Sequence, residues 1–115
     1  MKEYDLEKRT ETFAAECRAF IRRLTLDIAN SEDARQLVRS SGSVPANYIE
    51  ANEALGKKDF LMKLRISRKE AKESRLWLNL LLTSQPQLTS EKERLLQECN
   101  ELKFILSAII RKNGG

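Results

Sequence analysis

Apolar residues recur at spacings of three and four along almost the whole chain of 115 residues. In the first segment, Phe13, Cys17 and Phe20 fall on one side of a helix with 3.6 residues per turn. Three later segments show the same periodicity, and none shows the strict apolar–polar alternation of a half-buried strand. We therefore predict an all-α chain with helices over about residues 3–29, 32–55, 60–82 and 91–112.

Four amphipathic helices of similar length, joined by short loops, favour an antiparallel up-down-up-down four-helix bundle. The chain has the length of one domain, so we assign residues 1–115 to a single bundle. Ser31 and Asp59 are expected to cap the second and third helices. Gly56 is expected to follow the end of the second helix, and Ser90 and Glu93 have the spacing of a capping box for the fourth.

Pro45 lies inside the second predicted helix, where it cannot donate the usual backbone hydrogen bond to the carbonyl of Ser41. Either a loop near Gly42 and Pro45 splits this segment into two short helices, or one helix continues through a kink. The apolar register runs unbroken across Pro45, which favours the kinked helix. The hydroxyls of Ser40, Ser41 and Ser43 are then expected to help satisfy the freed carbonyl.

Histidine is absent, which excludes Ser-His-Asp catalysis, Cys-His nucleophiles and histidine-ligated metals. Cys17 and Cys99 both lie on apolar stripes, so we expect buried free thiols in a reducing cytoplasm. We predict no enzymatic activity, cofactor or metal. No stretch has the apolar length of a membrane span, and the first residues lack the apolar region of a signal peptide, so no membrane role is expected.

The third segment carries the positive charge of the chain: its six basic and two acidic residues account for the whole net charge of +4. Five of the basic residues recur at helical spacing on one outer side of the predicted helix. These five, called the basic face below, are Arg65, Arg68, Lys69, Lys72 and Arg75. The face is either solvated or paired with acidic residues of the first segment, or it contacts nucleic-acid phosphates. No aromatic residue is interleaved among the five, so base stacking is not expected.

Two carboxylates, Glu70 and Glu73, lie on the other flank of the third segment. A carboxylate pair can serve as general acid and base or hold a metal, but a di-metal bundle would use Glu-x-x-His. Because histidine is absent, we expect a structural pair whose partner is Arg39 or Asn47 on the second helix.

The apolar residues Leu76, Trp77 and Leu80 add more apolar surface to the third helix than one bundle core needs. Such a surplus is typical of a contact surface between proteins. We therefore predict that these three residues lie at an interface between subunits.

The run from Arg39 to Ala51, RSSGSVPANYIEA, resembles the central motif of the bacterial four-helix-bundle proteins, also called 23S rRNA intervening-sequence or S23-type proteins. A second block, from Lys69 to Ser74 and on to Trp77, resembles the third helix of that family. The resemblance covers nearly the whole chain. It implies structural roles, in packing and in the kink, for the motif residues Arg39, Ser40, Pro45, Asn47, Glu70 and Glu73.

The resemblance also implies a function. The family has no assigned enzymatic activity, and a relative, the accessory protein of diversity-generating retroelements, is a basic pentamer that binds nucleic acid and a reverse transcriptase. By similarity we expect a homo-oligomer, with a pentamer as the leading assembly, and RNA or DNA and a protein such as a reverse transcriptase as partners. Together with the basic face, this predicts a nucleic-acid-binding or ribonucleoprotein accessory module. The alternative is a protein-interaction scaffold without a nucleic-acid role.

Overall fold

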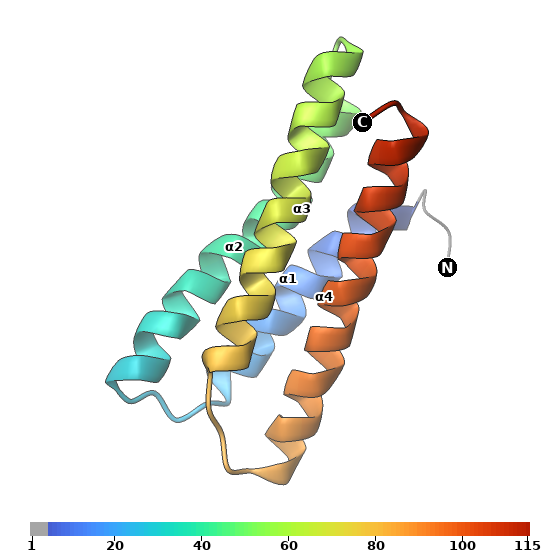
Figure 1. Ribbon diagram of the computed structural model, residues 1–115. Helices are drawn as coiled ribbons and strands as arrows, with labels where there is room; N and C mark the ends of the chain where they lie inside the picture. The colour runs from blue at the N-terminus through green and yellow to red at the C-terminus, as the bar shows by residue number, and fades with distance from the viewer. Residues whose placement is uncertain (1–4) are drawn as a thin grey trace.

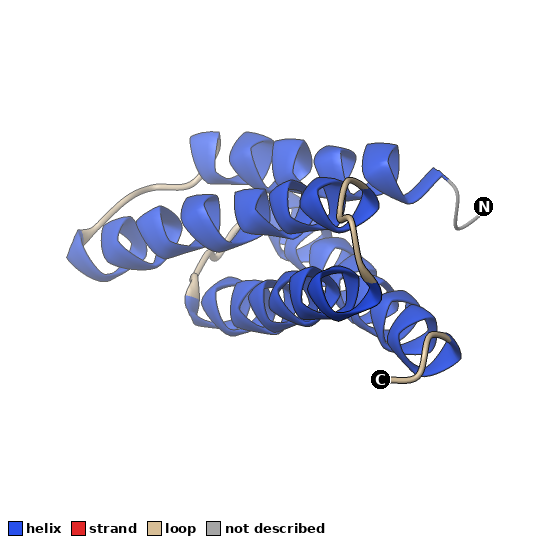
Figure 2. Ribbon diagram, turned by 90° about the horizontal axis from the view of Figure 1, so that it is seen from above, coloured by secondary structure: helices blue, strands red, loops and turns tan. Residues whose placement is uncertain are grey.

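The computed structural model describes residues 5–115, and within them it contains four α-helices: α1 (Leu6–Arg22), α2 (Ile28–Asn52), α3 (Lys57–Leu80) and α4 (Pro86–Lys112). The helices alternate in direction, with the α1–α2 and α3–α4 connections at one end and the α2–α3 connection at the other (Figure 1). Successive helices pack together, and α1 also packs against α4. The described residues contain only helices and short loops (Figure 2). The predicted all-α up-down-up-down bundle is confirmed.

The first connection lies earlier in the chain than predicted. α1 ends at Arg22 instead of near residue 29, and its predicted start near residue 3 lies outside the described residues. Asp27 caps α2, because its carboxylate accepts a hydrogen bond of 2.7 Å from the backbone N–H of Asn30. The predicted cap at Ser31 is wrong, since Ser31 lies in the first turn of α2.

α3 also begins before its predicted cap. It starts at Lys57 with Gly56 as the N-cap residue, and Asp59 lies in the first turn, where a negative charge favours the helix dipole. α2 ends at Asn52, with Glu53 after it, so Gly56 belongs to the start of α3. The predicted roles of Asp59 and Gly56 are both wrong.

α4 begins at Pro86, ahead of the predicted capping box. Proline favours the first helical position because its missing N–H would have no partner there. Ser90 and Glu93 therefore lie inside α4, and the predicted box is wrong.

The bundle core consists of the apolar stripes found in the sequence. Cys17 and Cys99 are buried and carry free thiols, as predicted. On α3 the stripe begins with Leu61 fully inside the core, while Phe60 packs against its edge. Large side chains that are at most 1% exposed include Leu6, Phe13, Phe20, Leu37, Leu64, Leu78, Leu81, Leu95, Leu102 and Leu106.

Small residues bring α2 and α3 close together. Ser67 of α3 donates a buried hydrogen bond of 2.8 Å to the carbonyl of Val44 on α2. Ser40 lies one turn before Val44 on α2, and Ser74 lies two turns after Ser67 on α3. The hydroxyls of Ser40 and Ser74 share a buried hydrogen bond of 2.8 Å. Hydroxyls within hydrogen-bond reach of the opposite helix fix the register of this helix pair.

α2 continues through Pro45 as one helix, so the continuous reading is confirmed. The serine hydroxyls do not act as expected. Ser43 donates to the carbonyl of Arg39 at 3.0 Å, and Ser41 donates to the carbonyl of Val38 at 3.4 Å. These hydroxyls serve carbonyls upstream of the one that Pro45 frees, which corrects the expected role.

Asn30 joins the two loops at one end of the bundle. Its side chain is 5% exposed and donates to the carbonyls of Leu82 at 2.8 Å and Thr25 at 3.2 Å. It also accepts a hydrogen bond of 3.0 Å from the backbone N–H of Leu82. One amide therefore ties the α3–α4 connection to the start of α2.

Candidate nucleic-acid interface

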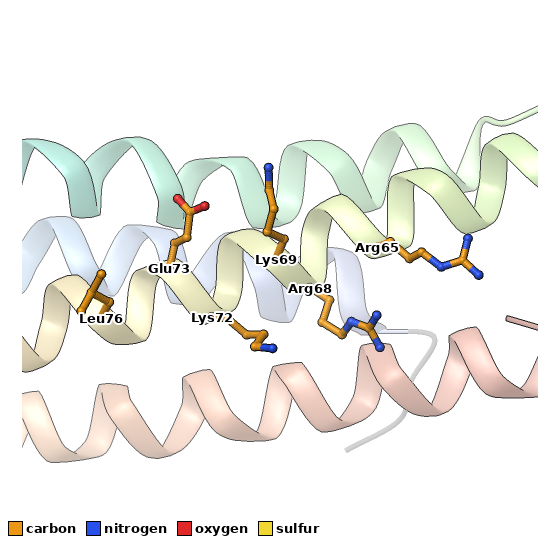
Figure 3. Close-up of a pocket in the computed structure, with 6 residues that line it drawn as sticks. All are labelled: Arg65, Arg68, Lys69, Lys72, Glu73 and Leu76. Atoms are coloured by element: carbon orange, nitrogen blue, oxygen red, sulfur yellow. The ribbon is translucent and has the colours of Figure 1, made fainter.

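The basic face lies on the surface of α3, and Figure 3 shows four of its five residues, Arg65, Arg68, Lys69 and Lys72. Arg68 is half-buried, and the other four residues are exposed. Figure 3 shows Arg68 and Lys72 pointing toward α4, whereas Lys69 points toward the side of α2. The cations therefore cover a broad arc of the helix surface that includes its junction with α4.

Most of these cations have no carboxylate partner among residues 5–115. Arg65, Lys72 and Arg75 form no ion pair there. Arg68 donates to the hydroxyl of Ser107 on α4 at 3.3 Å, which orients the guanidinium without neutralising it. Only Lys69 approaches a carboxylate, at 3.8 Å from Glu70.

The acidic residues of α1 do not supply the expected pairing. Glu16 binds Arg94 of α4 at 3.0 Å, and Glu7 accepts a hydrogen bond from Asn52 of α2 at 2.8 Å. α1 packs against α2 and α4. Pairing of the basic face with the first segment is therefore wrong for the described residues; Glu3 lies outside them. A solvated face and a phosphate-binding face remain.

α4 extends the positive surface with Lys103. The thiol of Cys99 donates to the carbonyl of Ala71 at 3.0 Å, and Ser107 binds Arg68, so the 99–103–107 side of α4 faces α3. Burial raises the pKa of Cys99 to about 12, and the nearby cations Arg75 and Lys103 oppose this rise. Arg75 on α3 and Lys103 on α4 thus both lie near the thiol of Cys99.

The α1–α4 and α2–α3 junctions contrast with this one, because both carry ion pairs. Arg9 of α1 binds Glu98 and Glu101 of α4 at 2.7 and 2.6 Å, and its contacts with these carboxylates raise its pKa. Arg39 of α2 lies 3.3 Å from Glu73 of α3. Between α3 and α4, the described residues form no ion pair. The cations at the α3–α4 junction are therefore left uncompensated within residues 5–115. The α1–α2 junction has no ion pair there either, but its Arg18 donates to the carbonyls of Ala14 and Val38.

A hollow of about 320 Å³ opens among the cations of α3 (Figure 3). Arg65, Arg68, Lys69 and Lys72 line it, together with Glu73 and Leu76. Four cations and one carboxylate give the hollow a net positive lining that suits an anionic group such as a phosphate.

The motif residues make contacts within the bundle. Arg39 reaches Glu73, and its guanidinium also lies 3.8 Å from the buried carboxylate of Glu70. Asn47, the other expected partner, donates instead to the carbonyl of Ser43 at 2.8 Å. One oxygen of Glu70 is buried and has no hydrogen-bond partner in the described residues. The contacts of Arg39 with Glu70 and Glu73 join α2 to α3.

The expected interface residues divide into two groups. Leu76 and Leu80 are about half exposed, at 48% and 47%, and Met62 on the same helix is 48% exposed. Trp77 is half-buried and packs against the core, with its indole N–H buried and without a partner in the described residues. Leu76 and Leu80 therefore present apolar surface, whereas Trp77 contributes to the packing of its own bundle.

Sequence reasoning missed Lys103 and the exposed Phe104 beside it. The basic face was read from α3 alone, because a heptad pattern shows one helix at a time. The sequence contains the spacing Cys99–Lys103–Ser107. Only the contacts of Cys99 and Ser107 with α3 show that this side of α4 borders the basic face.

Residues 5–115 contain neither a candidate membrane span nor a candidate metal site. No helix there is both long and apolar enough to cross a bilayer. No three His, Cys, Asp or Glu side chains of those residues gather where they could hold a metal ion.

Comparison with known proteins identifies the family. The chain is similar over 90% of its length to a crystal structure from Bacteroides thetaiotaomicron VPI-5482, a protein of unknown function from the S23 ribosomal protein family. The two share 26% identity with a TM-score of 0.76, and the match covers 96% of that chain. No curated protein matches. Neither description names an enzymatic activity. Residues 2–108 match the 23S rRNA-intervening sequence protein family, and the chain belongs to it.

Proposed function

We propose that the protein is a non-enzymatic accessory module that binds nucleic acid through the basic face and works in the cytoplasm. The observation that carries the proposal is the uncompensated charge at the α3–α4 junction. Arg65, Lys72 and Arg75 have no ion-pair partner among residues 5–115, and Lys103 adds a cation from α4. The two buried free thiols fit a reducing compartment.

Charge of one sign at helical spacing costs a few tenths of a kcal/mol for each neighbouring pair. Binding of a polyanion relieves this repulsion. Each phosphate contact also releases condensed counterions, which favours binding. The basic face extends from Arg65 to Arg75, or about 15 Å at 1.5 Å per residue. Side chains three or four residues apart on a helix have Cβ atoms about 5–6 Å from one another, so Arg65, Arg68, Lys72 and Arg75 can each contact a different phosphate of one strand.

The family supports RNA as the first ligand to test. Its description refers to the intervening sequence of 23S rRNA, and the similar solved protein is assigned to a ribosomal protein family. Within residues 5–115, successive helices run antiparallel (Figure 1), unlike the crossed helix pair of a helix-turn-helix module, which inserts a recognition helix into a DNA groove. We therefore propose recognition of the phosphate backbone with little reading of base sequence.

A second candidate function, a protein-interaction scaffold, is favoured by the apolar surface on α3. Met62, Leu76 and Leu80 are each about half exposed on this one helix. We propose that they form contacts between subunits of a homo-oligomer, with a pentamer as the first assembly to test, or with a protein partner such as a reverse transcriptase. Both functions are compatible, because an oligomer would present several basic faces at once.

The proposal is tested by replacing Arg65, Arg68, Lys72 and Arg75 with glutamine and measuring RNA affinity by fluorescence anisotropy. A matched control replaces four exposed cations elsewhere, at Lys8, Arg22, Arg35 and Lys58, which form no ion pair among the described residues. Both variants lower the net charge by the same amount, so they separate the position of the charge from its total.

We expect the basic-face variant to lose more than ten-fold in affinity while the control loses less than about three-fold. Circular dichroism should show that both variants retain the helical fold. Equal losses in the two variants would show that only the total charge matters. Undiminished affinity of the basic-face variant would remove this face as the binding site.

A further inference from the structure

Phe104 is an aromatic side chain without a place in the core. It is 64% exposed, although it lies in the middle of α4 between the buried residues Leu102 and Leu106. The ammonium of its neighbour Lys103 lies 4.7 Å from the centre of the phenyl ring, within the range of a cation–π contact. Most of the ring surface remains open to solvent.

The position of Phe104 relates it to the basic face. Phe104 lies one turn from Ser107, whose hydroxyl binds Arg68 of α3, and next to Lys103, which lies near Cys99 together with Arg75. Residues three apart on a helix are neighbours on its surface. The ring therefore lies on the shoulder of α4 that borders the cations of the α3–α4 junction.

A phenyl ring beside a row of cations matches the chemistry of single-strand binding. The cations follow the phosphate backbone, and an unpaired base can stack on the aromatic ring, which accepts any base because every base has a flat π surface. A duplex keeps its bases stacked inside the helix, so it would contact the cations but leave the ring unused.

We propose that Phe104 is a base-stacking platform and that the favoured ligand of this surface is single-stranded nucleic acid. The inference rests on the proposed function, because it assigns a ligand class to the same surface. It also revises the expectation from α3 alone that base stacking plays no part: the aromatic residue comes from the neighbouring helix.

The test compares two labelled probes, a single-stranded RNA without self-complementarity and the duplex of the same sequence. Variants Phe104→Ala, Phe104→Leu and Phe104→Trp are measured with both, and Leu55→Ala in the α2–α3 connection serves as the control for loss of an exposed apolar side chain. Because Phe104 is largely exposed, the substitutions should leave the fold intact. Light scattering of each variant shows whether the assembly changes.

We expect the alanine and leucine variants to weaken single-strand binding by about five-fold or more, the effect of losing one stacked base. The tryptophan variant should retain the affinity, and binding of the duplex should change less than about two-fold. Leu55→Ala should leave both affinities unchanged.

Four results would overturn the inference. If Phe104→Ala leaves the single-strand affinity unchanged, stacking is refuted. The proposed function is then still tested separately, by the RNA affinity of the basic-face variant. Equal weakening of the single strand and the duplex, or a change of assembly in Phe104→Ala alone, assigns the ring to another contact. If the wild-type protein binds neither probe at low salt, both proposals fail together.

Discussion

Replacing Asn30 with alanine should destabilise the bundle far more than the loss of one exposed polar residue would. The side chain of Asn30 is 5% exposed and makes hydrogen bonds of 2.8 and 3.2 Å to the carbonyls of Leu82 and Thr25. It accepts a third bond of 3.0 Å from the N–H of Leu82. Each such bond contributes about 0.5–1.5 kcal/mol net, so we expect a total loss of about 2–4 kcal/mol.

Urea denaturation followed by circular dichroism measures this loss. With a slope of about 1–3 kcal/mol per molar urea, the midpoint should fall by about 1–2 M. Asn30→Asp should be at least as destabilising, because it keeps the acceptor for the N–H of Leu82 but places a carboxylate oxygen against two carbonyls.

Asn79→Ala is the matched control, since Asn79 is an exposed residue of α3 whose side chain makes no hydrogen bond within the described residues. Its free energy of unfolding should change by less than about 0.5 kcal/mol. If Asn30→Ala also changed the free energy of unfolding by less than about 0.5 kcal/mol, the reasoning would be refuted. Such a result would mean that this amide does not hold the two loops together.

Two other predictions concern buried groups. Burial raises the pKa of both thiols, Cys17 and Cys99, above the ordinary value of 9.0, and that of Cys99 reaches about 12. The thiols of the unfolded chain therefore lose their protons at a lower pH than those of the native protein. The free energy of unfolding should then fall as the pH rises above 9.0. Urea titrations at mildly and strongly alkaline pH check the sign, and rapid reaction of the native protein with a thiol reagent would contradict burial. Arg39→Met should cost about 1–2 kcal/mol by leaving the buried Glu70 with Lys69 as its one nearby cation, and adding Glu70→Gln should recover most of that loss in a double-mutant cycle. Absence of recovery would show that the two residues act independently.

The existence and order of the helices were predictable because each stripe repeats over many turns. The α3 stripe of Leu64, Ser67, Ala71 and Leu78 is buried as its spacing indicates. A long periodic signal averages over local irregularities, and short loops between such segments leave few alternatives to an antiparallel bundle.

The helix ends were not predictable in the same way, because several residues near each end could act as caps. Both Asp27 and Ser31 are suitable cap residues, and the helix begins at the earlier one. The deciding contact is made by Asn30, which must lie in the first turn of α2 to reach Leu82, more than fifty residues away in sequence. Local sequence carries no information about that contact.

Part of the candidate site could be predicted from the sequence, because spacing alone shows which residues share one side of a helix. The spacing of Arg68 and Lys72 shows which residues share one side of α3, and that assignment needs no knowledge of other helices. The contributions of Lys103 and Phe104 depend on which side of α4 lies against α3. Rotation of one helix relative to another is a tertiary property that the periodicity of either helix alone does not determine.

The salt dependence of RNA affinity tests the central claim most directly. Four phosphate contacts should give log K against log salt a slope of about −3 to −4, which is a loss of about 50- to 150-fold between about 50 and 200 mM salt. Replacing Arg65, Arg68, Lys72 and Arg75 with glutamine should make the slope shallower by about three, and the matched control variant should keep the wild-type slope. If the basic-face variant shows the same slope as the wild-type protein, phosphate binding by this surface is contradicted.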